Sequence, residues 1–352
     1  MVQVGRGIQR VLRDDGCLWL NLGDSFASQG GSASIEQKVA SGAGTGNSLK
    51  IPVPQRKPPA GLKAKDLCGI PWRVAFALQA DGWYLRMDNV WAKGNPMPEP
   101  VTDRPVKSHE YVFMLTKEQR YWYDAEAIKE GLSDATLKDL ASRQKPGCHD
   151  GDTKQFGKMA GLGAGPRVKG QTRHKLSVWQ INTTGFPGGH FAVFPVELAR
   201  TCILASCPPK VCAECGKPWE RIVQRGNSKH HCRPGCGCGA DQKHGKQNWD
   251  DGWEQYGNYT DTSIPTDEFE PKCKCDAETI PGTVLDPFSG AGTCGVVCRD
   301  LGLNYIGIEL NPSYANMSRQ RIADPFYETK LRQHQRVERE NKEQIGLFDD
   351  EG

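Results

Sequence analysis

The pattern of hydrophobic and polar positions divides the chain into short apolar segments separated by long polar ones. Cys17–Leu22 is a continuous apolar run apart from Asn21, which predicts a buried strand. The helical spacing of Ile8, Val11 and Leu12 predicts the end of a helix just before it. The same reasoning predicts helices at 71–81 and 194–205, the second of them amphipathic, and strands at 83–91, 111–116 and 177–181.

The polar segments show neither helical nor strand periodicity. Glycine, serine, proline and lysine dominate residues 27–65, which predicts a long loop. Residues 129–175 are basic and contain many glycines, whereas residues 208–280 are rich in cysteine and mixed in charge. The tail beyond Tyr327 is charged and has little to bury, so we expect it to be either a solvated helix or disordered.

Residues 284–311 give the clearest chemical signal. They read as a strand, a glycine turn, a helix and a second strand with an acidic end. Gly290 and Gly292 allow a tight turn after Asp286, so that a cofactor can lie against the next helix. Glu309 follows the second strand, about 20 positions beyond the turn, where doubly wound folds hold ribose hydroxyls. The segment therefore predicts a nucleoside cofactor, although a glycine turn alone also fits a turn without a ligand.

Composition narrows the class of protein. Hydrophobic residues make up 37% of the 352 positions and the mean hydropathy is −0.59, which indicates a sizeable core with long polar insertions. The net charge is only +3, so any surface for nucleic acid must be local. There is no apolar run of the length that spans a membrane and no signal-peptide pattern, which predicts a soluble protein in a prokaryotic or viral-host cytoplasm.

Several motifs together resemble the amino-group DNA methyltransferases. The lead Asp286-Pro287-Phe288, the glycine turn and the sequence from Glu309 to Pro312 are similar to their S-adenosylmethionine site. A P-loop nucleotide-phosphate binder would carry Gly-Lys-Ser/Thr after the turn, and that sequence is not present. Residues 11–26, 91–117 and 190–199 resemble further parts of the family, in the order of its permuted beta class.

The resemblance implies a fold class and a division of the chain. We expect an α/β protein with a Rossmann-like methyltransferase sheet of circularly permuted motif order, which lacks its catalytic strand. Residues 1–128 would form the catalytic half, and 129–176 a basic insert that recognises duplex DNA. Residues 177–207 and 281–327 would form the cofactor half, 208–280 a small zinc-binding insert, and 328–352 a charged tail.

The resemblance also assigns candidate site residues. Asp286, Phe288, Gly290 and Gly292 would surround the methionine and ribose, and Glu309 would accept hydrogen bonds from both ribose hydroxyls. His190 and Phe191 would cover the methionine end. On the side of the target base we expect Lys93, Asn95 and Pro96, continued by Arg104, His109 and Glu110. Taken singly, Phe288 also fits core packing, and the 93–98 loop a surface turn.

The chain departs from the family at the catalytic motif. These enzymes carry a tetrapeptide of the type Asp/Ser-Pro-Pro-Tyr, which family order places upstream of Met1 and which the sequence does not contain. Asp324-Pro325-Phe326-Tyr327 follows the second cofactor strand and is in the wrong place. The leading hypothesis is methyl transfer to adenine N6 or cytosine N4 in duplex DNA, with base flipping. The alternative is a truncated remnant that binds cofactor or DNA without catalysis; an RNA or protein methyltransferase fits the permuted order less well.

Clustered cysteines predict a metal site. Cys212 and Cys215 have zinc-knuckle spacing, and Cys273 with Cys275 supplies a second pair, so four thiolates can close a structural zinc site. The signature of zinc deaminases is missing, which argues against a catalytic metal. A second cluster between the pairs could form another site or replace the second pair: His230, His231, Cys232, Cys236 and Cys238.

The basic segment lies where the family keeps target recognition. Positive charge interleaved with glycine suits a phosphate backbone, although a charged loop is often only solvated. A cognate restriction endonuclease is a candidate partner. The basic positions are Lys129, Lys145, Lys154, Lys158, Arg167, Lys169, Arg173 and Lys175.

Overall fold

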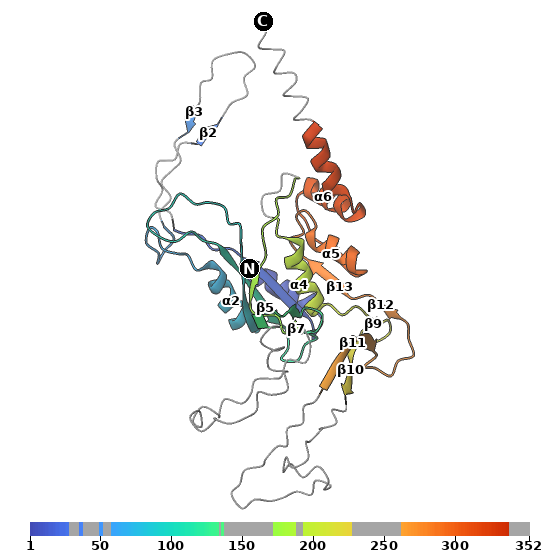
Figure 1. The fold of residues 1–352 in the computed structure, drawn as a ribbon. Coiled ribbons are helices and arrows are strands. Elements are labelled where there is room, and N and C mark those ends of the chain that lie inside the picture. Colours follow the sequence, from blue (N-terminus) through green and yellow to red (C-terminus); the bar gives the residue numbers. More distant parts are fainter. Residues whose placement is uncertain are drawn as a thin grey trace, which may run out of the picture.

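The computed structural model describes residues 1–27, 35–37, 49–51, 58–133, 135–136, 172–187, 193–226 and 262–337 (Figure 1). Its largest sheet has the order β1-β5-β4-β8. The strands are β1 (Cys17–Leu22), β4 (Tyr84–Ala92), β5 (His109–Thr116) and β8 (Val178–Gln180). β5 runs antiparallel to both neighbours, and β8 is parallel to β4.

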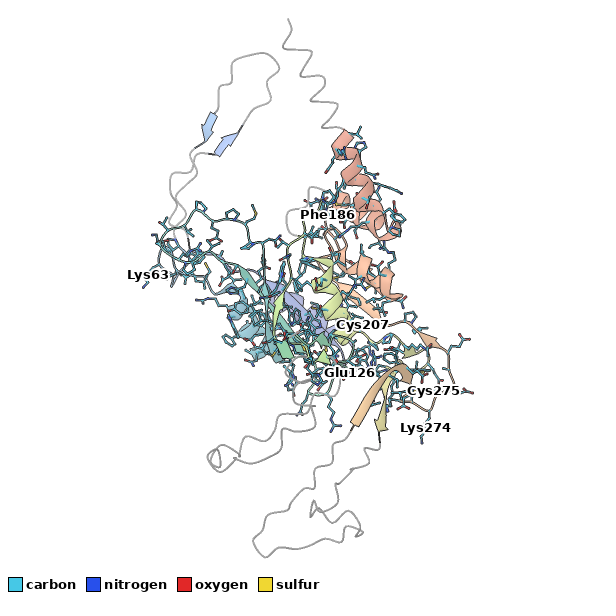
Figure 2. The ribbon with its side chains drawn as sticks, in the orientation of Figure 1. Lys63, Glu126, Phe186, Cys207, Lys274 and Cys275 are labelled. Atoms are coloured by element: carbon cyan, nitrogen blue, oxygen red, sulfur yellow. The ribbon has the colours of Figure 1, made fainter. Side chains whose placement is uncertain are left out.

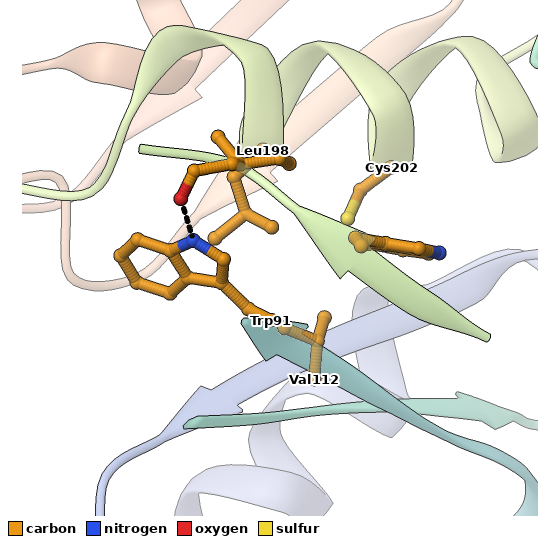
Figure 3. Close-up of a cluster of buried hydrophobic side chains, with 6 residues drawn as sticks. Trp91, Val112, Leu198 and Cys202 are labelled. Atoms are coloured by element: carbon orange, nitrogen blue, oxygen red, sulfur yellow. Dashed lines mark hydrogen bonds between the residues drawn. The ribbon is translucent and has the colours of Figure 1, made fainter. Parts of the chain in front are cut away.

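The pleat of β5 explains why this sheet has an apolar core on each face. Phe113 and Leu115 point to one face, where they pack with α2 (Ile70–Ala80), and α1 (Val2–Val11) adds partly buried side chains there. Val112 points to the other face, where it packs with Trp91 and with α4 (Val196–Ser206). Figure 3 shows this second cluster, in which the indole nitrogen of Trp91 donates a 2.7 Å hydrogen bond to the Ile181 carbonyl.

A second α/β unit follows at the C-terminal end. β13 (Thr283–Asp286) and β14 (Asn304–Gly307) pair in parallel, with α5 (Thr293–Leu301) between them in sequence and α6 (Pro312–Ala323) after them. A parallel pair joined by a helix is the βαβ unit of doubly wound folds. Residues 327–337 continue in a helix, which agrees with the solvated helix expected for the start of the tail.

Helix α4 packs against both units and lies between them (Figure 1). The sequence predicted an amphipathic helix here, and this was wrong in one respect. Leu198 and Cys202 face the large sheet, whereas Ala199 and Ile203 face α5, where Val297 is fully buried. The helix is therefore buried on two sides, and its polar residues are too few to form a solvent-facing stripe.

The remaining strands form short antiparallel pairs. β9 (Val211–Cys212) pairs with β12 (Thr279–Ile280), β10 (Glu220–Gly226) with β11 (Thr262–Glu270), and β6 (Glu130–Gly131) with β7 (Thr172–Arg173). β2 (Ile35–Gln37) pairs with β3 (Leu49–Ile51). The prediction that 27–65 is entirely irregular was thus wrong, because three-residue strands are too short to reveal a period. Within the described residues, no helix is long and apolar enough to cross a membrane.

Candidate functional site

The glycine turn follows the carboxyl end of β13. Gly290 and Gly292 have φ angles of 50° and 75°, a region that favours glycine. Gly292 also lies against α6, because a Cβ there would stand 2.2 Å from Ser318 Oγ. The turn therefore needs glycine at 292 for two reasons, its backbone angle and its contact with the next helix.

Glu309 connects the two ends of this unit. One carboxylate oxygen accepts the amide N–H of Gly290 at 2.8 Å, and the other accepts the amide N–H of Asn311 at 2.8 Å. Two amide donors hold the carboxylate in one orientation beside the turn. A carboxylate has about four acceptor positions, so each oxygen can take a second hydrogen bond.

Asp286 ends β13 and is mostly buried. Its Oδ1 accepts the amide N–H of Phe288 at 3.0 Å, whereas its Oδ2 is buried without a hydrogen-bond partner in the described part of the chain. Burial raises the pKa of Asp286, with the Phe288 amide acting in the opposite direction and the charge of Glu309 adding to the rise. Burial and the nearby Asp286 raise the pKa of the Cys294 thiol as well.

Arg321 on α6 stabilises the glycine turn, and the sequence analysis did not identify this residue. This α6 side chain is 4% exposed and donates hydrogen bonds to the Ala291 carbonyl at 3.1 Å and to Thr293 Oγ1 at 2.9 Å. It also forms an ion pair with Glu328 at 2.6 Å. Local periodicity gives no sign of such a role, because an arginine in a polar helix normally faces solvent.

The predicted target-side residues lie in a loop fixed by side-chain contacts. Lys93 Nζ lies 2.5 Å from Glu110 Oε1 and 4.6 Å from the ring centre of Trp91. Asn95 exchanges hydrogen bonds with the backbone of Thr183, donating at 3.0 Å and accepting at 2.8 Å. The loop between β4 and β5 is thereby tied to the segment after β8.

A cavity of about 1740 Å³ joins the two groups of predicted residues. Lys93 and Pro96 line it on one side, and Asp286, Phe288 and Glu309 on the other. Phe288 is 61% exposed, which does not fit the core-packing interpretation. Gly290 and Glu110 also line this cavity, whereas Asn95, Gly292, Arg104 and His109 do not.

The other candidates fall into two groups. His190, Phe191 and the cluster at 230–238 lie outside the described residues. Arg104 forms an ion pair with Glu99 at 2.8 Å, and His109 packs edge-on against Tyr111. Neither of these two side chains lines the cavity.

The two cysteine pairs come together in space. The Sγ atoms of Cys212, Cys215, Cys273 and Cys275 all lie within 4.8 Å of one another. Cys275 belongs to the part of the chain around β10 and β11, well apart from Phe186 beside α6 (Figure 2). Because the glycine turn lies against α6, the cysteine cluster is separate from it. Hydrogen bonds from the backbone amides of Cys215 and Glu214 lower the pKa of the Cys212 thiol to about 7.

Comparison with known proteins decides the family. The model of a DNA methylase family, named for N6 and N4 methyltransferases, matches residues 1–212 and 276–320. The chain belongs to the N6/N4 DNA methylase family. It is 35% identical to the type II methyltransferase M.SmaI of Serratia marcescens over 322 residues, which are 92% of this chain and 72% of the relative. It is 34% identical to the type II methyltransferase M.Cfr9I of Citrobacter freundii over 322 residues, which are 92% of this chain and 70% of the relative.

Solved structures were also found. One is the PvuII DNA methyltransferase, described as cytosine-N4-specific, with 13% identity and a TM-score of 0.45 over 92% of this chain and 69% of the other. Another is a complex of M1.HpyAVI with SAM, with 13% identity and a TM-score of 0.41 over 91% of this chain and 82% of the other.

Membership of the N6/N4 DNA methylase family confirms several expectations. The chain is an S-adenosylmethionine-dependent DNA amino-methyltransferase with a Rossmann-like α/β fold, as its motifs predicted. Residues 213–275 fall outside the match to the family model, and they contain most of the cysteine-rich segment. The family model does not match this segment.

The glycine turn gives a testable prediction. Gly292→Ala should lower the free energy of unfolding by about 3 kcal/mol, since it combines backbone strain with a clash against Ser318. Gly302→Ala is the matched control, because Gly302 has a similar φ of 66° and no neighbour within 4 Å. It should cost only about 1–2 kcal/mol. Urea denaturation measures both, and equal losses would show that the contact with α6 is unimportant.

Proposed function

We propose that S-adenosylmethionine binds at the turn between β13 and α5, and that the target base enters the same cavity from the side of Lys93 and Pro96. The observation that supports this most is the shared cavity, because methyl transfer requires donor and acceptor to be held together. A base inside the duplex cannot reach a methyl donor, so it must rotate out of the helix.

The cofactor side offers acceptors that suit a ligand with hydroxyl and amino groups. Glu309 is oriented by two amides, and we propose that its oxygens accept the ribose hydroxyls. Asp286 Oδ2 is a buried acceptor without a described partner, which a donor group of the cofactor would satisfy. Phe288 exposes its ring to the cavity and would pack against the cofactor.

The reaction forms a bond between carbon and the exocyclic nitrogen of adenine or cytosine, breaks the bond between carbon and sulfur, and releases a proton from the nitrogen. That nitrogen is conjugated with its ring, so orientation in a site with little water supplies much of the catalysis. Among the described residues, Lys93 is held by Glu110 near the cavity and Asn95 is held by Thr183. We propose that this fixed loop positions the base.

The catalytic residues themselves stay a prediction, because the 352 residues contain no Pro-Pro-aromatic tetrapeptide. This observation favours a second candidate, a protein that binds cofactor or DNA without transferring methyl groups.

Incubation with labelled S-adenosylmethionine and unmodified duplex DNA, followed by nucleoside mass spectrometry, tests the proposed reaction. We expect N6-methyladenine or N4-methylcytosine. Cofactor binding without any labelled nucleoside would support the second candidate. Formation of 5-methylcytosine would contradict the amino-group assignment, since that reaction proceeds through attack of a cysteine on the ring.

Calorimetry with S-adenosylmethionine tests the role of Glu309. Glu309→Ala should weaken binding by about 1.5–3 kcal/mol, because it removes charge-assisted hydrogen bonds. Glu268→Ala replaces an exposed glutamate on β11 and should leave affinity unchanged. Equal affinity for wild type and Glu309→Ala would remove this residue from the site.

We propose a structural zinc ion at the cysteine cluster. Thiolates around tetrahedral zinc stand roughly 3.8 Å apart, as follows from a zinc–sulfur distance of about 2.3 Å, and the four Sγ atoms need only a small contraction to reach this spacing. The surrounding segment is docked on the catalytic half. Arg221 forms an ion pair with Asp124 at 2.7 Å, and Trp122 donates a hydrogen bond to the Trp219 carbonyl at 3.1 Å.

Metal analysis tests this proposal. The purified protein should contain about one equivalent of zinc, because four thiolates complete one tetrahedral site. Cys215→Ser should lose most of it, whereas Cys68→Ser, which lies outside the cluster, should retain it. Chelation should accelerate amide exchange in β9 to β12 more than in β13. Zinc well below half an equivalent, with freely titratable thiols, would refute the site.

Two further proposals concern the partners of the protein. The basic insert remains a candidate interface with DNA, although its described cations are engaged: Lys129 pairs with Glu126, and Arg173 and Lys175 pair with Glu130. The other basic positions lie outside the described residues. A cognate restriction endonuclease is proposed because several relatives are named type II methyltransferases.

A further inference from the structure

Residues 182–187 contact both parts of the site, and we call them the bridging segment. They follow β8 and form neither helix nor strand. A backbone without regular structure has to place its hydrogen bonds elsewhere. Near the start of the segment, the amide and carbonyl of Thr183 both bond to the side chain of Asn95. This end of the bridging segment is therefore held by the loop between β4 and β5.

The other end of the bridging segment is held by the charged tail. The tail helix (residues 327–337) directs two side chains at this backbone. Arg332 donates a 2.7 Å hydrogen bond to the Gly185 carbonyl, and Gln335 donates a 2.6 Å hydrogen bond to the Pro187 carbonyl. Within the described ranges, neither carbonyl accepts from another donor. The tail thus supplies hydrogen bonds that the segment does not obtain from either sheet.

The tail helix is itself fixed to α6. Between the two helices, Asp324 accepts the amide N–H of Phe326 at 2.9 Å and forms an ion pair with Lys330 at 2.7 Å. Glu328 of the tail helix pairs with Arg321 of α6 at 2.6 Å. Exposed ion pairs contribute little, but Arg321 is only 4% exposed, so water screens its pair less. The tail helix is therefore a support with a defined position.

Arg321 lies where the glycine turn, the tail helix and the bridging segment meet. It donates a hydrogen bond to the Ala291 carbonyl of the turn at 3.1 Å, and its guanidinium carbon lies 4.8 Å from the ring centre of Phe186. A cation over an aromatic face makes an attractive contact. Figure 2 shows Phe186 beside α6. Because one side chain contacts both groups, the bridging segment passes close to the glycine turn.

The bridging segment is also a wall of the cavity. Thr184, Gly185 and Phe186 line the 1740 Å³ cavity, and they line a second cavity of about 750 Å³ as well. A segment that borders two cavities has few packing partners, and segments with few buried contacts open locally at low free-energy cost. The position of this wall therefore depends on the hydrogen bonds at its two ends.

We propose that Arg332 and Gln335 are positioning residues for methyl transfer. They act through the bridging segment, which extends from the target-side loop to the glycine turn and so sets the base relative to the cofactor. This rests on the proposed function, which places S-adenosylmethionine at the turn and the base near Lys93. Transfer depends on such alignment. Binding at the turn and order in the bridging segment are then coupled, and this coupling is reciprocal.

Hydrogen exchange of the full chain measures this coupling. In the wild type, saturating S-adenosylmethionine should slow exchange about fivefold in the peptide of residues 181–187, because a fixed turn fixes Phe186 through Arg321. Combining Arg332→Ala with Gln335→Ala should speed exchange there about fivefold without cofactor and abolish the slowing by cofactor. Calorimetry should show about fivefold weaker binding of S-adenosylmethionine to this double variant, since binding then has to order the segment.

Two further variants separate positioning from a general effect on the fold. Arg332→Lys keeps a cationic donor for the Gly185 carbonyl and, with Gln335 intact, should retain wild-type exchange and affinity. Gln333→Ala replaces an exposed glutamine of the same helix, which makes no hydrogen bond within the described part of the chain, and should change neither quantity. Exchange in β5 should be equal in all variants if the fold is intact.

Unchanged exchange of residues 181–187 in the double variant would overturn the proposal. Faster exchange with unchanged affinity and unchanged slowing by the cofactor would also overturn it, because the tail would then only support the fold. Faster exchange in β5 as well would assign the effect to loss of the fold and would count against positioning. A wild type that binds no S-adenosylmethionine would contradict the proposed function itself, and this result differs from the other three, in which the wild type binds.

Discussion

Burial of helix α4 on two sides is the constraint on which the described fold depends. The large sheet and the β13–β14 pair share no strand pairing among the described residues, so side-chain packing must set their relative position. Leu198 belongs to one core and Ile203 to the other. An ion pair of 3.2 Å between Arg200 and Asp300 fixes α4 against α5. Because the cavity has walls from both units, its shape is determined at this helix.

The charges of the site suit its proposed ligand. The charge of Glu309 is close enough to raise the pKa of Asp286, and Arg321 of α6 forms an ion pair with Glu328. The two carboxylates make the region acidic, and backbone amides donate hydrogen bonds to Glu309. A cationic sulfonium compound meets favourable electrostatics there, whereas a phosphate-bearing nucleotide would be repelled. This agrees with the absence of Gly-Lys-Ser/Thr after the glycine turn.

Local patterns predicted the elements well where one physical signal dominated. β1 was predicted at its observed bounds, because an apolar run with a clear stop is unambiguous, and the glycine turn was found because few residues tolerate its angles. Contacts between distant segments could not be predicted. Asn95 meets Thr183, and Arg321 meets Ala291, only after the chain has folded. The spacing of Cys212 and Cys215 indicated a knuckle, but only the fold brings the second pair to it.

The cysteine cluster also bears on how the chain tolerates variation. β9 and β12 pair directly, with Cys212 opposite Thr279, so the segment between them leaves and returns at one place. A loop whose ends are already adjacent costs only about 0.6 kcal/mol more for each doubling of its length. Residues between the two cysteine pairs can therefore be lengthened, shortened or exchanged with little effect on α4 or β13. In evolution, this segment can change its binding properties while the methyltransferase domain keeps its geometry.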